Sequence, residues 1–175
     1  MQPPEAELAA IDDAFALVLP ALDSLDDGQA RGPSLLPGWS RGHLLTHLAR
    51  ASEGDRRCVE GAARDEVVMK YPAGADGRAA DIDAGAGRDA VALVADVVSA
   101  QRALMDALRS LPDDAWERRA GTLVGVRTMV ELAIARRREL LVHLVDLDVG
   151  VEPTDLPRDY LDVDADWLAE FRPTW

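Results

Sequence analysis

The sequence predicts an all-α protein built as a bundle of four long helices. In four separate stretches, apolar residues recur at the three- and four-residue spacing of an amphipathic helix. These stretches cover residues 5–25, 41–63, 89–111 and 128–149. Because each helix would carry one apolar stripe, packing the four stripes together forms a single core. We therefore expect one domain over residues 1–175.

Turn signals separate the first two predicted helices. Residues 26–28 (Asp-Asp-Gly) end the helix over residues 5–25. Residues 35–39 (Leu-Leu-Pro-Gly-Trp) have the composition of a loop. Ser40, which follows them, is suited to cap the helix over residues 41–63.

Two connections and a tail complete the chain. Residues 64–88 are rich in Gly, Ala and Asp and predict a long irregular connection between the second and third helices. A connection of that length is usually functional or contains short structure of its own. Pro112 stops the third helix, residues 113–127 form a second connection, and Thr128 can cap the fourth helix. A tail then leads into a short helical piece over residues 158–171.

Composition and charge exclude several classes of function. The 175 residues carry a net charge of −13, which argues against nucleic acid or an anionic membrane surface as a partner. No apolar run approaches the ~20 residues of a membrane span. The first ten residues are acidic, unlike a signal peptide. The single cysteine, Cys58, rules out an internal disulfide, so we expect a cytoplasmic protein.

The histidines suggest a metal site. Glu139 and His143 are four residues apart and share one helix face, although such pairs are common on solvated surfaces. The two other histidines of the chain, His43 and His47, both lie on the second predicted helix. If these faces meet inside the bundle, three or four ligands converge, and two histidines with one carboxylate leave a zinc position open. The alternative is that the histidines are ordinary core or surface groups and Glu139 pairs with an arginine.

Two segments carry a resemblance to a known family. Residues 36–50 (LPGWSRGHLLTHLAR) resemble the segment near the start of the mycothiol-dependent maleylpyruvate isomerases. That family belongs to the DinB-like superfamily of metal-binding four-helix bundles. Residues 138–147 (RELLVHLVDL) resemble its second motif, and residues 78–83 and 111–116 are similar less specifically. The resemblance covers most of the chain and implies a DinB-like fold.

The resemblance also implies a ligand set. The metal ligands would be His47, Glu139 and His143, which act in catalysis through the metal. Zinc is the implied ion, although two histidines and a carboxylate also suit nickel, iron or cobalt. His43 matches a position that is not a ligand in the family, where it orients substrate or fills space. Asp146 would support a ligand from outside the metal's own shell or be a solvated or capping residue.

Further side chains are candidates for binding the cofactor or substrate together with His43. Trp39 would wall the site or pack as a hydrophobic staple. Arg50 and Arg138 would each contact an anionic group or pair with one of the many acidic residues. Cys58 lies about 16 Å along the helix from His47, too far to bind the same ion, and is predicted to be a core residue.

The open metal position suggests the chemistry. Zinc would hold the sulfur of a small thiol as the thiolate, a strong nucleophile that attacks an electrophilic carbon. In a cis–trans isomerase the thiolate adds to a double bond, the new single bond rotates, and elimination restores the alkene. In an S-transferase the adduct is kept. The family's thiol in actinobacteria is mycothiol, which the Arg-rich, Lys-poor composition does not contradict.

Maleylpyruvate isomerases of this family carry a further C-terminal domain that contributes to the active site, whereas this sequence ends at Trp175. The expected function is therefore that of a zinc- and thiol-dependent isomerase or S-transferase. Its site would be closed by residues 155–175 or by a second subunit in a homodimer. The alternative is a non-catalytic bundle that binds a metal or small ligand, as a sensor does. The complete ligand triad favours the enzyme, since a domain freed from catalysis need not keep all three ligands.

Overall fold

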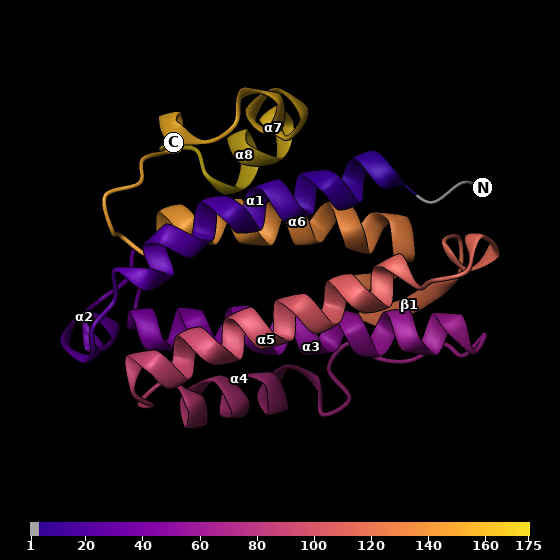
Figure 1. Cartoon of the computed structure of the whole chain (residues 1–175), viewed down its shortest axis with the longest axis horizontal. Coiled ribbons are helices and arrows are strands. Elements are labelled where there is room, and N and C mark those ends of the chain that lie inside the picture. The colour runs from indigo at the N-terminus through magenta and orange to yellow at the C-terminus, as the bar shows by residue number, and fades with distance from the viewer. Residues whose placement is uncertain (1–3) are drawn as a thin grey trace.

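Four long helices form the bundle in the computed structural model, which describes residues 4–175. Residues 1–3, which begin the acidic N-terminal segment, lie outside the described residues. The long helices are α1 (Glu5–Asp23), α3 (Arg41–Ala63), α5 (Ala90–Arg109) and α6 (Met129–Asp146). Helix α1 packs on α6, and α3 packs on α5 (Figure 1). Contacts of α3 with α6 and of α1 with α5 complete the ring. The predicted all-α four-helix bundle is confirmed.

Each long helix contributes fully buried aliphatic side chains to a single core. Ile11, Leu44, Leu104 and Leu140 come from α1, α3, α5 and α6 in turn, and none of them is exposed to solvent. Cys58 is equally buried within α3, which confirms its prediction as a core residue. Burying one such aliphatic side chain stabilises the fold by about 1.5–3 kcal/mol.

Both predicted helix caps are present. Ser40 accepts a hydrogen bond from the backbone N–H of His43 at the start of α3. Thr128 accepts one from the backbone N–H of Glu131 at the start of α6. In both places the third helical residue returns a side-chain bond to the backbone N–H of the cap, which completes a capping box. These caps set where the two helices begin.

Hydrogen bonds from Arg41, which we call the Arg41 clamp, join the start of α3 to the end of α6. Arg41, the first residue of α3, donates from Nε to the carbonyl oxygen of Leu147 at 2.6 Å. Its Nη2 donates to the carbonyl oxygen of Asp148, also at 2.6 Å. A guanidinium at these carbonyls neutralises the negative end of α6. The clamp therefore holds the start of α3 against the end of α6.

The connection over residues 64–88 was predicted to be long and irregular. It instead contains a helix, α4 (Gly74–Gly85). Only Ile82 of this helix is buried, so the apolar repeat that would reveal it in the sequence is missing. Helix α4 packs along the outer side of α3 (Figure 1). The approach is close at Gly42, where a Cβ would collide with the carbonyl oxygen of Ala86. A further short helix, α2 (Asp27–Arg31), follows the end of α1.

The connection over residues 113–127 contains a 3₁₀ turn, η1 (Asp113–Ala115), and a β-hairpin. Strands β1 (Arg119–Thr122) and β2 (Gly125–Thr128) pair antiparallel, with Ala120 opposite Arg127. Beyond the hairpin itself, the N–H of Lys70 donates to the carbonyl oxygen of Gly121 at 2.8 Å. The connection after α3 is thereby tied to the hairpin before α6.

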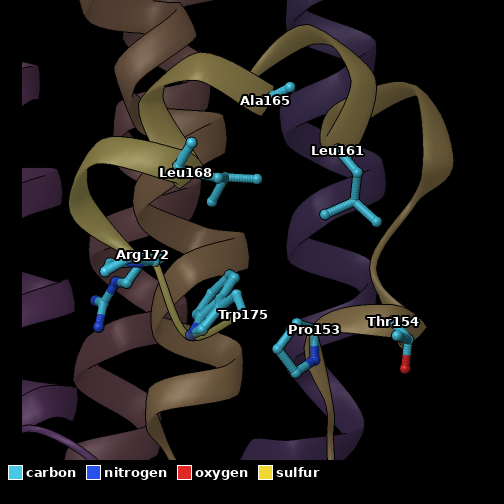
Figure 2. Close-up of a pocket in the computed structure, with 9 residues that line it drawn as sticks. Pro153, Thr154, Leu161, Ala165, Leu168, Arg172 and Trp175 are labelled. Carbon is cyan, nitrogen blue, oxygen red and sulfur yellow. The ribbon is translucent and has the colours of Figure 1, made fainter.

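The C-terminal segment forms a turn and two short helices rather than the one helical piece predicted over residues 158–171. These are η2 (Pro153–Asp155), α7 (Arg158–Val163) and α8 (Ala165–Phe171). The segment lies beside α1, away from α3 and α5 (Figure 1). The segment encloses a hollow of about 430 Å³. Pro153, Arg172 and Trp175 are among the residues that line it (Figure 2). Within residues 4–175, no helix has the length and apolar character needed to cross a membrane.

We expect Gly42→Ala to destabilise the protein by about 1–3 kcal/mol. The new methyl group would collide with the backbone carbonyl oxygen of Ala86, which cannot move away as a flexible side chain could. The free energy of unfolding, measured by urea denaturation, checks this. Gly87→Ala is the control, since its Cβ would meet open space and the change should stay within about 0.5 kcal/mol. Equal stability of the two variants would contradict the close packing of α4 on α3.

Candidate metal centre

One ligand atom from each of His47, Glu139 and His143 converges at a single point between α3 and α6. The Nε2 atom of His47 lies 3.0 Å from Oε2 of Glu139 and 3.2 Å from Nε2 of His143. The Nε2 atom of His143 lies 3.4 Å from the same carboxylate oxygen. Within the described part of the chain, this is the one group of three such residues with the spacing of a metal site.

These separations match the geometry of a small divalent ion. Ligand atoms about 2.0–2.1 Å from a tetrahedral zinc lie about 3.3 Å from one another. The three atoms therefore occupy three corners of a zinc-sized tetrahedron without movement of the helices. Two imidazoles and one carboxylate are ligand types that zinc accepts. The donor set fits a divalent metal with one coordination position left for water or a ligand.

The outer ring nitrogens of the two histidines have different partners. Nδ1 of His143 lies 2.8 Å from Oδ2 of Asp146, so this nitrogen carries the ring proton and donates it. The lone pair on Nε2 of His143 then points into the centre, as a metal requires. Nδ1 of His47 lies 3.0 Å from Nη2 of Arg78, which can only donate. The neutral ring of His47 therefore carries its proton on Nε2. Metal binding through Nε2 requires that proton to move to Nδ1, and Arg78 must then change partner.

The charges at the centre are set by burial and by the triad itself. Burial lowers the pKa of His47 to about 4, which keeps its ring neutral. Burial alone would raise the pKa of Glu139, but the two histidines beside it hold that pKa well below its usual value. Burial alone would lower the pKa of His143, but hydrogen bonds to Asp146 and Glu139 raise it above 6.5. The centre thus contains an ionised carboxylate, that of Glu139, and an imidazole that becomes protonated more readily than usual, that of His143.

Asp146 links this centre to the C-terminal segment. Its side chain is 1% exposed, so it is neither solvated nor on the surface. Its Oδ2 atom accepts from Nδ1 of His143 and also from Nη2 of Arg172, the latter at 2.6 Å. Asp146 therefore fixes the ring of a ligand, while Arg172, which follows α8, fixes Asp146.

Two further candidates lie where the chain enters α3, Trp39 in the preceding loop and His43 in the first turn of the helix. The ring of Trp39 meets His47 edge-on at 5.7 Å between centroids, and Trp39 also packs on the core. His43 serves the capping box, because its Nδ1 accepts from the backbone N–H of Ser40 at 3.1 Å. His43 therefore has a structural partner and is not one of the three converging residues.

The two candidate arginines are held in ion pairs. Arg50 contacts Asp96 through two bonds of 2.7 and 2.8 Å and also pairs with Glu53. Arg138 makes two bonds to Asp164, of 2.7 and 2.6 Å, and its guanidinium lies 4.6 Å from the ring centroid of Trp167. Arg138 also lines a cavity that Glu139 and His143 line.

Two cavities open from the triad. The hairpin-side cavity, about 280 Å³, is lined by His47 and Glu139 together with Asp55, Lys70, Arg78 and Arg127. The tail-side cavity, about 300 Å³, is lined by Glu139 and His143 together with Arg138, Trp167, Phe171 and Arg172. Glu139 lines both cavities, so both reach the triad.

Sequence reasoning missed most of the residues that line these cavities. Lys70 was recognisable as the single lysine, directly before a Tyr-Pro pair. Arg78 lies in residues 78–83, a segment similar to the family. Nothing in the sequence pattern singles out Arg127 or Arg172, because their positions depend on the hairpin and on the C-terminal segment.

Fold and site together define a four-helix bundle with a candidate metal centre, to which α3 contributes one residue and α6 contributes two. A sequence model of the family described as "Mycothiol maleylpyruvate isomerase N-terminal domain" matches residues 8–148. The chain belongs to this family.

Two solved structures agree with this assignment. One is the crystal structure of the mycothiol-dependent maleylpyruvate isomerase, and the other is that of a histidine-to-alanine mutant of the same enzyme. Each superimposes with a TM-score of 0.88 at 25% sequence identity, covering 94% of this chain and 69% of the other. A search of curated proteins finds no match.

We expect the affinity for a divalent metal to fall as the pH decreases. A metal needs the lone pair on Nε2 of His143, and the raised pKa of this group lets protons compete from above pH 6.5 downward. Below that pKa the affinity should fall about tenfold per pH unit, as measured by competition with a chelator. An affinity that stays constant from about pH 8 to about pH 5 would contradict the proposed role of His143.

Asp146→Asn should weaken metal binding about 10–100-fold, because a neutral amide supports the His143 ring less strongly than a carboxylate does. The same chelator competition measures this. Asp106→Asn is the matched control, since Asp106 is exposed on α5 and contacts neither the triad nor Arg41. Equal affinities of both variants would show that Asp146 does not support the metal.

Proposed function

We propose that this chain is a metal-dependent enzyme that uses a low-molecular-weight thiol, mycothiol or a similar one, and acts on an electrophilic substrate. The reaction is that of a maleylpyruvate isomerase or a thiol S-transferase. The observation that carries this proposal is the convergence of His47, Glu139 and His143 with one coordination position left over. Family membership and the likeness to a mycothiol-dependent maleylpyruvate isomerase support it.

The donor set suits thiol chemistry. A divalent metal such as zinc, when bound here, would keep a thiol sulfur ionised near neutral pH. The triad supplies two neutral imidazoles and one carboxylate, so it cancels only one of the metal's two positive charges. The remaining charge favours an anionic fourth ligand over a neutral one. His143 is held in the required orientation by Asp146, which reduces the reorganisation needed on binding.

The cavities provide space for two reactants. A reaction between a thiol and an electrophile requires both molecules to lie next to the same atom in a fixed orientation. The hairpin-side cavity reaches His47 and Glu139, and the tail-side cavity reaches Glu139 and His143. Each reactant can therefore occupy its own cavity while their reacting atoms meet at the triad.

Metal analysis with matched variants tests the proposal. We expect about one zinc per chain in protein purified without chelators, and loss of that zinc in His47→Ala and in His143→Ala. His43→Ala is the control and should keep its metal, because His43 caps α3 and does not reach the triad. Wild-type protein that takes up no divalent metal would rule out the proposed enzyme.

The thiol is tested on the same protein after replacement of the metal by Co²⁺, whose visible and near-ultraviolet spectrum reports thiolate ligation. Adding mycothiol should produce a sulfur-to-cobalt absorption band, and maleylpyruvate should then be tested for conversion. A protein that binds metal but neither ligates a thiol nor turns over an electrophile would be a metal-binding bundle without catalysis.

A further inference from the structure

The hairpin-side cavity contains cations without ordinary counterions. Most arginines of this acidic chain pair with a carboxylate, as Arg50 and Arg138 do. Arg78 and Arg127, which line the cavity, make no ion pair with any aspartate or glutamate of residues 4–175. Within the same residues, the side chain of Arg127 donates only to the carbonyl oxygen of Val126, at 3.3 Å, so both arginines keep donors that an anion from outside the chain could use.

Arg78 is held in place by aromatic rings rather than by a carboxylate. Its guanidinium lies 5.9 Å from the ring of Trp39 and 5.7 Å from the ring of Tyr71. Stacking of this kind fixes the planar group while leaving its N–H edge available to an acceptor. One of its nitrogens, Nη2, contacts Nδ1 of His47, so the group lies directly beside the triad.

The groups behind the cavity add further positive charge. Nζ of Lys70 lies 2.7 Å from the buried carboxylate of Asp55. Arg136 is fully buried, and its Nε donates to Gln101 at 2.8 Å. Neither Nη atom of Arg136 has a hydrogen-bond partner among the described residues.

Together the cavity and the groups behind it hold four cations, Lys70, Arg78, Arg127 and Arg136, against two carboxylates, Asp55 and Glu139. The excess persists when a metal neutralises Glu139, since the metal adds more positive charge than the carboxylate removes. Such a site attracts anions and strengthens every hydrogen bond donated to them.

We propose that the hairpin-side cavity binds the carboxylate or a comparable oxyanion of one reactant, with Arg127 and Arg78 as the groups that select it. This inference rests on the proposed function only in placing a reactant beside the triad. A guanidinium suits a carboxylate because it offers two parallel N–H donors. About 280 Å³ accommodates a small acid but not a large ligand.

Arg127 is the residue to change, because it lies on the exposed hairpin and contacts no triad residue. Its matched control is Arg119, also exposed and without a carboxylate ion pair among the described residues. Arg127 lies opposite Ala120, so Arg119, one position along the same strand, projects from the other face of the hairpin. The two variants thus remove the same charge from the same hairpin on different faces.

The test is calorimetric titration of the full chain with fumarate, a small dicarboxylate, before and after removal of the metal. We expect one fumarate to bind in both forms and Arg127→Gln to weaken binding about tenfold or more, with Arg119→Gln unchanged. The neutral diamide of fumarate should bind far more weakly. Absence of fumarate binding, or equal losses in the two variants, would overturn the proposal without affecting the metal and thiol results.

Kinetics then distinguish which reactant carries the anion. In the metal-loaded protein, Arg127→Gln should raise the KM of the electrophile alone if that molecule carries the oxyanion, or of the thiol alone if the thiol does. Either result supports the subsite. Unchanged KM values for both reactants would overturn it, even if the protein turns over normally.

Discussion

The register between α3 and α6 is the constraint on which the metal centre depends, and Arg41 sets it. Its guanidinium binds the last carbonyls of α6 at Leu147 and Asp148. Counting inward from this clamp, six residues along α3 and four back along α6 reach His47 and His143. A slip of one residue would rotate a ligand by about 100° away from the centre. The clamp is charge-assisted and partly buried, so it resists such a slip.

Much of this arrangement was predictable from local patterns. The four long helices follow strong apolar repeats, and the caps at Ser40 and Thr128 are local motifs. The bounds of α3 and the start of α6 were therefore found nearly to the residue, whereas α6 ends at Asp146, three residues before the predicted end. Glu139 and His143 share a face because four residues make about one helical turn. That His47 joins them depends on how α3 meets α6, which the resemblance implied and residue spacing alone did not.

The remainder depends on contacts that no local pattern records. Helix α4 buries one side chain, Ile82, and docks because Gly42 allows its backbone to approach. The hairpin is held partly by a backbone hydrogen bond from Lys70, fifty-one positions before its acceptor Gly121. Likewise, an arginine binds a ligand or forms an ion pair according to which residues far away in the sequence lie beside it. Arg138, for example, pairs with Asp164. The excess of acidic residues predicted that these arginines would form ion pairs, but it did not indicate which carboxylate each would contact.

The position of Asp146 has a consequence for the end of the chain. One carboxylate oxygen receives both His143 and Arg172, so the docking of α8 and the orientation of a metal ligand are thermodynamically linked. This linkage is reciprocal. If docking of the segment strengthens ion binding by some free energy, then a bound ion stabilises the docked segment against local unfolding by the same free energy. Arg172 also borders the hollow of Figure 2. An ion bound at the candidate centre would therefore make the segment around Arg172 more rigid, and loss of the ion would loosen it.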